Sequence, residues 1–184
     1  MMAVLDIVHY GDPILNKKCA SIKNFEELNG IVDDMFDSMY EEEGIGLAAN
    51  QVGIDMNLFI IDITHTEEEE ETFTFINSEI IGLNGQKTKY QEGCLSLPNI
   101  ALEVVRPENV ILKYQTIDQK WHQNEFSGLM SRAIQHEMDH LNGVFIVDRI
   151  LKSERIKYQK QLRSLENNTK MKMEVIANQK KFVL

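Results

Sequence analysis

Apolar side chains recur every three or four residues in two parts of the chain, which is the spacing of one face of an α-helix. The first stretch follows Asn24, which we expect to cap a helix with Glu27 in capping-box position. The second ends at Asn142-Gly143, a pair typical of a helix stop. The apolar positions are Leu28, Ile31, Val32, Met35, Phe36 and Met39 in the first stretch, and Leu129, Ala133, Ile134, Met138 and Leu141 in the second.

Extended apolar runs between these two helices predict several strands. They cover residues 57–63, 73–81, 101–105, 110–117 and 121–126. Asn84-Gly85 is a turn dipeptide, and we expect it to form a turn after the second run. Residues 152–167 have helical composition, whereas residues 168–184 are polar and are expected to be partly disordered. The pattern predicts one α+β domain with an appended tail.

The formal net charge of −10 is divided unevenly along the chain. Residues 1–150 hold 10 Lys and Arg against 26 Asp and Glu, a balance of −16, and residues 151–184 hold 9 against 3, a balance of +6. An acidic body argues against DNA as a partner of the domain itself. No apolar run is long enough to span a bilayer and no secretory signal is visible, so we expect a cytoplasmic chain without a membrane partner.

The run IQHEMDHL places His136 and His140 four residues apart on the second predicted helix, with Glu137 directly after the first histidine. Residues at i and i+4 share one helix face, so the two imidazoles can bind one metal ion beside a carboxylate base. The alternative is a solvated helix face, because HExxH also occurs by chance. Apolar neighbours that would bury the histidines favour the metal site.

A catalytic metal needs a further protein ligand, and Cys94 in the run EGCLS is the candidate. A cysteine with two histidines leaves a fourth coordination position open for water. Cys94 can also be a buried core cysteine, and the spacing alone does not decide. The glycine-rich run GIGLAANQVG lets the backbone approach a ligand closely, and Gln51 within it offers an NH₂ donor. The alternative is that this glycine-rich run is an ordinary loop and that Gln51 is a surface residue.

Three runs, GIGLAANQVG, EGCLSLP and QHEMDHL, occur in this order and together resemble the signature motifs of the peptide deformylases. The resemblance covers roughly residues 3–150 and includes GDPIL near the start. It implies an α+β fold with antiparallel sheets around a central metal-binding HExxH helix, followed here by a C-terminal helical tail. The implied reaction is hydrolytic removal of the formyl group from the formyl-methionine of nascent polypeptides, with release of formate.

The resemblance also implies a role for each site residue. Glu137 would be the general base for attack by a metal-bound water, and Gln51 with the backbone N–H of Leu95 would stabilise the oxyanion. The ion in this family is normally Fe²⁺, although Zn²⁺, Ni²⁺ or Co²⁺ would also suit one cysteine and two histidines. The other implied assignments are Cys94, His136 and His140 as metal ligands, and Ile45, Gly46 and Gly93 as substrate-binding residues.

Two segments depart from or extend the resemblance. The run SLPNIALEVVR lacks an arginine that many relatives carry shortly after EGCLS, while Glu92 and Arg106 can form an ion pair as in the family. Residues 151–184 form a basic helix and tail appended to a catalytic domain of residues 1–150. In some relatives such a helix docks on the ribosome, and its charge suits rRNA phosphates. A solvated tail without a docking role fits the sequence equally well.

Two other functions are weighed against deformylation. HExxH alone also suggests a metallopeptidase, but no zincin-type third ligand follows the motif, and the candidate cysteine precedes it. A homologue that binds nascent chains without catalysis is the other alternative, and the presence of every reacting residue argues against it. Formyl-methionine peptides are therefore the expected partners.

Overall fold

A five-stranded antiparallel sheet with helices packed against it forms the body of the protein, and the computed structural model describes residues 4–66 and 71–181. The predicted α+β class is confirmed. The strands are β1 (Gly46–Ala48), β2 (Leu58–Ile61), β3 (Phe73–Glu92), β4 (Leu102–Gln115) and β5 (Trp121–Phe126). The helices are α1 (Leu28–Glu41), α2 (Gly128–Leu141), α3 (Lys152–Arg155) and α4 (Gln159–Lys181), with 3-10 turns at Pro13–Asn16, Ala49–Val52, Ile146–Asp148 and Ile156–Tyr158.

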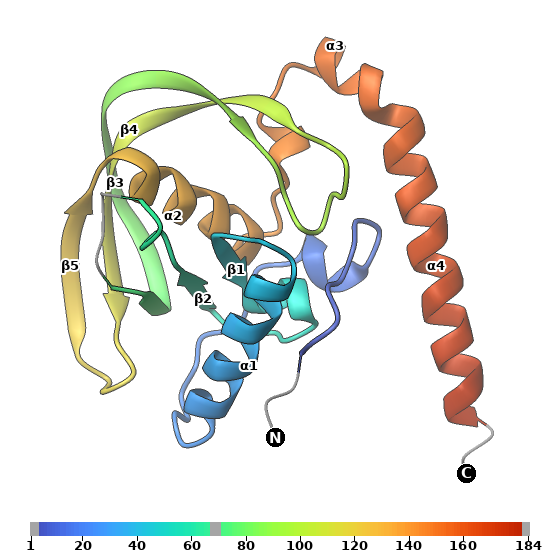
Figure 1. Cartoon of the computed structure of the whole chain (residues 1–184), viewed down its shortest axis with the longest axis horizontal. Helices are drawn as coiled ribbons and strands as arrows, with labels where there is room; N and C mark the ends of the chain where they lie inside the picture. The colour runs from blue at the N-terminus through green and yellow to red at the C-terminus, as the bar shows by residue number, and fades with distance from the viewer. Residues whose placement is uncertain (1–3, 67–70, 182–184) are drawn as a thin grey trace.

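The strands lie in the sheet in chain order, and each pairs antiparallel with the next. The longest pair, β3 and β4, arches over helix α2 (Figure 1). The turn expected at Asn84-Gly85 is wrong, because both residues lie inside β3. Gly85 has a φ of +79°, and the pairing register shifts between Asn84 and Lys87. The dipeptide therefore forms an irregularity within a strand that continues to Glu92.

The apolar stripe of α2 packs on one face of the sheet, as its spacing predicts. Ile134 of α2 and Phe75 of β3 are both fully buried in this cluster. Burial of one such side chain stabilises the fold by about 1.5–3 kcal/mol. The cluster also contains Cys19, Ala48, Phe59, Ile61, Ile63, Val110, Leu112, Tyr114, Met130, Ala133, Met138 and Leu141. This packing fixes the helix that carries both histidines of the HExxH motif.

Helix α1 begins at Leu28, so the expected capping box at Asn24 is wrong. The Asn24 side chain instead accepts a hydrogen bond from the backbone N–H of Glu26 at 3.0 Å. This bond closes a local turn before the helix starts. Glu27 is the N-cap residue and makes no side-chain cap bond.

Strand β2 is buried on both faces, which explains its continuous apolar run. Phe59 and Ile61 belong to the core cluster of α2, whereas Leu58 and Ile60 belong to the cluster of α1. All four side chains are fully buried. Because residues of a strand alternate between its two faces, β2 lies between two helical layers.

Helix α4 packs against the N-terminal segment and lies on the side of the molecule away from β5 (Figure 1). The expected partial disorder of residues 168–184 is wrong for residues 168–181, which are helical, and residues 182–184 lie outside the described part. Leu162 is buried in a cluster with Leu15, and the Thr169 hydroxyl donates a hydrogen bond of 3.0 Å to the carbonyl of Tyr10. These tertiary contacts support a helix whose sequence is mostly polar.

None of the described helices combines the length and the apolar character needed to cross a lipid bilayer.

Replacing Gly11 by alanine is expected to destabilise the protein by about 1–3 kcal/mol. Gly11 has a φ of +103°, and an added Cβ would lie 2.7 Å from the Cα of Glu166 in α4. Urea unfolding measures the loss. Gly30→Ala in α1 is the control, because nothing lies within 4 Å of its added Cβ and the change should stabilise by about 0.4–1 kcal/mol. Equal stability of wild type and Gly11→Ala would show that α4 does not pack closely on this turn.

Candidate active site

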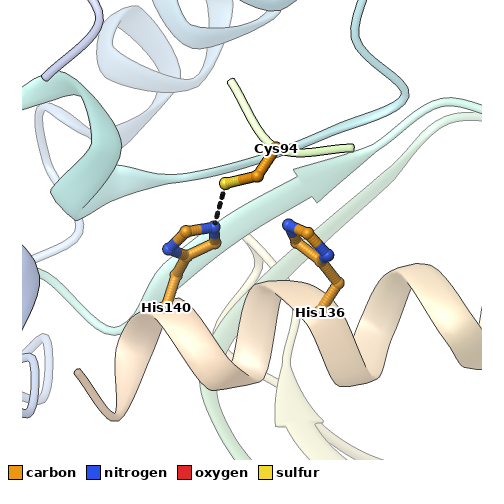
Figure 2. Close-up of side chains that lie close together, drawn as sticks. All are labelled: Cys94, His136 and His140. Carbon is orange, nitrogen blue, oxygen red and sulfur yellow. Dashed lines mark hydrogen bonds between the residues drawn. The ribbon is translucent and has the colours of Figure 1, made fainter. Parts of the chain in front are cut away.

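The loop after β3 brings Cys94 to the face of α2 that carries His136 and His140 (Figure 2). One ligand atom from each residue lies within 4.8 Å of the other two, and Cys94 Sγ is 3.1 Å from His140 Nε2. The two histidine rings rise from successive turns of α2 with their centroids 5.1 Å apart. The three side chains suggested as ligands by the sequence therefore lie together.

The carboxylate of Glu92, two residues before Cys94, holds one of these histidines. Its Oε1 accepts hydrogen bonds from Arg106 Nε and Arg132 Nη1, each at 2.7 Å. Its Oε2 accepts one from Arg106 Nη2 at 2.9 Å and lies 3.1 Å from His136 Nδ1. Burial opposes ionisation, but the hydrogen bonds from His136 and Arg106 outweigh it and hold the pKa of Glu92 well below its usual range. Glu92 is thus ionised, and Nε2 of His136 is left as the available ligand atom.

Glu137 is buried against strand β1, with only 4% of its surface exposed. A Cβ added to Gly46 would lie 2.6 Å from Glu137 Oε1, so the carboxylate occupies space that any other residue in place of glycine would fill. Glu137 Oε2 is buried and has no hydrogen-bond partner among the described residues. Burial raises the pKa of Glu137 to about 7, against opposing effects of His136 and Arg106. The carboxylate therefore has one free acceptor atom for a group in the cleft.

The side-chain amide of Gln51 has a fixed orientation. Its Oε1 accepts the backbone N–H of Ala48 at 2.9 Å, which turns Nε2 toward the loop after β3. There Nε2 donates to Ser96 Oγ at 3.3 Å and lies 3.9 Å from Cys94 Sγ. In the same loop, the backbone N–H of Leu95 has no acceptor within the described part of the chain. The arrangement offers two N–H donors near the sulfur.

These groups line a cleft of about 730 Å³, which is a size typical of small-ligand sites. The cleft is bounded by β1, the loop after β3 and helix α2. Of the site residues predicted from the sequence, all line the cleft except His140, which is buried with 2% of its surface exposed. Ile45, Gly46 and Gly93, the predicted substrate-binding residues, are among the lining residues.

The donor set fits one divalent transition-metal ion. A thiolate with two imidazoles is compatible with iron, zinc and related ions. Burial lowers the pKa of His140, so its ring is neutral and can offer a lone pair. The contact of His136 Nδ1 with Glu92 is the carboxylate contact that metal-binding histidines usually make. Three protein ligands would leave a coordination position for water or substrate.

Sequence reasoning did not single out Arg132, Asp139 or Ser96 as parts of the site. Arg132 and Asp139 are buried and bind Glu92 and Arg106 respectively. A signal for them existed, because charged residues within the buried part of a helix predict ion pairs. Ser96 had no such signal, because its bond to Gln51 joins the loop after β3 to the 3-10 turn Ala49–Val52, and the fold sets how closely the two approach.

Comparisons with known proteins agree with this geometry. Residues 4–156 match the family model described as Polypeptide deformylase. A peptide deformylase of Acidobacterium capsulatum is 47% identical over 150 residues, which is 81% of this chain and 88% of that protein. One of Chromobacterium violaceum is 44% identical over 169 residues, covering 90% of this chain and 99% of that protein. A crystal structure of peptide deformylase from Plasmodium falciparum has a TM-score of 0.84 at 38% identity and covers 90% of this chain and 98% of that one. The chain therefore belongs to the polypeptide deformylase family.

Proposed function

We propose that this cleft hydrolyses the N-terminal formyl group of formyl-methionine on nascent polypeptides and releases formate. The observation that carries the proposal is the convergence of Cys94, His136 and His140 within 4.8 Å, beside the buried carboxylate of Glu137. Membership of the polypeptide deformylase family points to the same reaction. A reaction on nascent chains is consistent with action in the cytoplasm.

Cys94, His136 and His140 are the residues that would hold the metal ion. When bound, the ion supplies a Lewis acid that makes water a nucleophile at neutral pH and polarises a carbonyl oxygen. We propose Fe²⁺ as the physiological ion, and Zn²⁺, Ni²⁺ and Co²⁺ suit the same donors. Glu92 supports this set by contacting His136 at Nδ1, 3.1 Å away.

Glu137 is proposed to move a proton in both halves of the reaction. Its buried Oε2, without a partner among the described residues, can accept a proton from the attacking water. The same carboxyl then donates that proton to the methionine nitrogen as the bond between carbon and nitrogen breaks. The products are formate and a peptide with a free α-amino group.

Gln51 and Leu95 are proposed to stabilise the negative charge that develops on the formyl oxygen. Preoriented N–H donors stabilise such a charge without reorganising during the reaction. The bond from Ala48 to Gln51 Oε1, 2.9 Å long, provides this orientation for the Gln51 amide. The N–H of Leu95, without an acceptor in the described chain, would be the second donor.

Ile45, Gly46 and Gly93 are proposed to contact the substrate. Strand β1 begins at Gly46 and pairs only with β2 in the described sheet. Its other edge can therefore pair with an extended peptide. Close packing of Gly46 against Glu137 restricts the space beside the carboxylate, which favours a formyl group over a larger acetyl group.

Residues 151–184 are proposed to be a basic appendage of the catalytic domain (residues 1–150) that docks on the ribosome. Their 9 Lys and Arg against 3 Asp and Glu give a balance of +6. Lys157 and Lys160, for example, are exposed near the start of α4. Such side chains can bind rRNA phosphates, whereas the negative charge of the acidic body is repelled by those phosphates.

Replacing Glu137 by glutamine is expected to lower kcat for formate release from formyl-Met-Ala-Ser by about 10²–10⁴-fold, because an amide cannot take the proton. The protein is purified without oxygen, and the metal content of the same samples is expected to be unchanged. Glu154→Gln, on the exposed helix α3, should keep wild-type turnover. Near-normal turnover by Glu137→Gln would exclude it as the base. A metal-loaded wild type that releases no formate would exclude deformylation itself.

Replacing Gln51 by leucine is expected to lower kcat by about 10²–10³-fold with a smaller change in KM, because the lost amide acts on the developing charge. Steady-state kinetics with the same peptide give the two constants, and thermal unfolding reports the effect of losing the bond to Ala48. Gln123→Leu on the exposed strand β5 is the control. A raised KM with unchanged kcat would instead assign Gln51 to ground-state binding.

Replacing Lys157 and Lys160 by glutamine is expected to weaken co-sedimentation with ribosomes and to reduce its dependence on salt. Each lost phosphate contact should lower the slope of log K against log salt by about 0.7–0.9. Lys87→Gln with Lys89→Gln on β3 removes the same charge from the body and should leave binding unchanged. Equal co-sedimentation of both double variants would leave these two lysines without a docking role.

A further inference from the structure

Arg132 is a buried cation in the wall of the cleft, and the reaction steps above do not use it. It lies on α2, one turn before His136, and is 8% exposed. Its guanidinium donates to the Glu92 carboxylate at 2.7 Å, to the Val104 carbonyl at 3.2 Å and to both oxygens of Thr88 at 3.0 Å. Four acceptors around Nη1 and Nη2 hold the planar guanidinium in one orientation.

The Glu92 carboxylate connects Arg132 to His136. Arg132 Nη1 binds Oε1, and His136 Nδ1 lies 3.1 Å from Oε2. Arg132 and His136 are four residues apart on one helix face, so the Glu92 carboxylate contacts two successive turns of α2. Together with Arg106, which binds both oxygens, Arg132 holds the rotation of the carboxylate and so directs Oε2 toward the histidine ring.

Arg132 also fixes the end of strand β3. Thr88, Tyr90 and Glu92 alternate along this strand and point to the same face. All three contact Arg132, since Tyr90 places its ring centroid 5.3 Å from the guanidinium carbon. Cys94 follows Glu92 by two residues, so the position of the strand end sets where the sulfur lies.

Arg106 binds the same carboxylate but joins different elements. It lies on β4 and connects Glu92 with Asp139, at 2.7 and 2.8 Å. Arg132 alone among the described residues binds both the Glu92 carboxylate and Thr88. Loss of Arg132 would leave Glu92 neutralised by Arg106, so a variant is expected to fold.

We propose that Arg132 is a positioning residue: through Glu92 it sets the ring orientation of His136, and through β3 it sets the distance of Cys94 from the two histidines. This inference rests on the proposed role of these three residues as metal ligands. It predicts that Arg132 affects metal affinity and site geometry, whereas an arginine that only packs would affect stability alone.

The test measures Co²⁺ and Zn²⁺ affinity by competition with a chelator, the visible spectrum of the Co²⁺ protein, and formate release by metal-saturated enzyme. Arg132→Met keeps the apolar stem and removes the guanidinium, while Arg132→Lys keeps a single cationic donor. Arg155→Met, which removes an ion pair with Asp148 away from the cleft, is the matched control. Thermal unfolding is followed for all four proteins.

Arg132→Met is expected to bind Co²⁺ and Zn²⁺ about 10–100-fold more weakly, with a changed Co²⁺ spectrum and a lower kcat after saturation. The metal affinity of Arg132→Lys should lie between those of Arg132→Met and wild type. If Arg132→Met does not fold, the affinity and spectrum of Arg132→Lys test the proposal. Wild-type metal affinity and spectrum in a folded variant, with only a lower Tm, would overturn the proposal. A wild type that binds metal but releases no formate would defeat the proposed reaction, and the affinities would still decide the role of Arg132.

Discussion

The ionised carboxylate of Glu92 is the constraint on which the site depends. A buried carboxylate is tolerated only when charged donors satisfy its oxygens, and here they come from Arg106, Arg132 and His136. These donors lie on strand β4 and on two turns of helix α2, whereas Glu92 ends strand β3. Satisfying one carboxylate therefore fixes three elements relative to one another, and the loop with Cys94 begins at that fixed point.

Arginine is used selectively in this otherwise acidic body. Residues 1–150 contain three arginines, Arg106, Arg132 and Arg149, and all three bind buried carboxylates of this cluster. Arg106 and Arg149 share Asp139, which lies on α2 three residues after His136. A planar guanidinium holds five donors in a rigid fork that matches the geometry of a carboxylate, whereas a lysine ammonium is a compact charge with freely rotating donors. The surface lysines of the body take no part in the cluster, so the charge balance of the chain says little about its site.

Most of the expectations that failed have the same physical cause. The turn at Asn84-Gly85 and the disorder of residues 168–181 follow from local preference, and tertiary contacts override both. At Asn24 the local preference for capping is instead met by a short turn before the helix. Strand β3 pairs with β4 on both sides of Asn84-Gly85, so the dipeptide forms an irregularity within the strand instead of a turn. Packing of α4 on the N-terminal segment keeps a polar run helical. Local propensities amount to a few tenths of a kcal/mol per residue, about the size of one good tertiary contact or less.

The sequence by itself determined the α+β class, helix α2 and the pairing of His136 with His140, because helical periodicity places both rings on one face. It also supplied the motifs that identify the family. Only the tertiary structure decided that Cys94 reaches those rings, that Gly46 packs on Glu137, and that Arg132 holds Glu92. The reason is that these contacts join residues far apart in the chain, and their geometry depends on how a long hairpin twists over a helix, which no local pattern records.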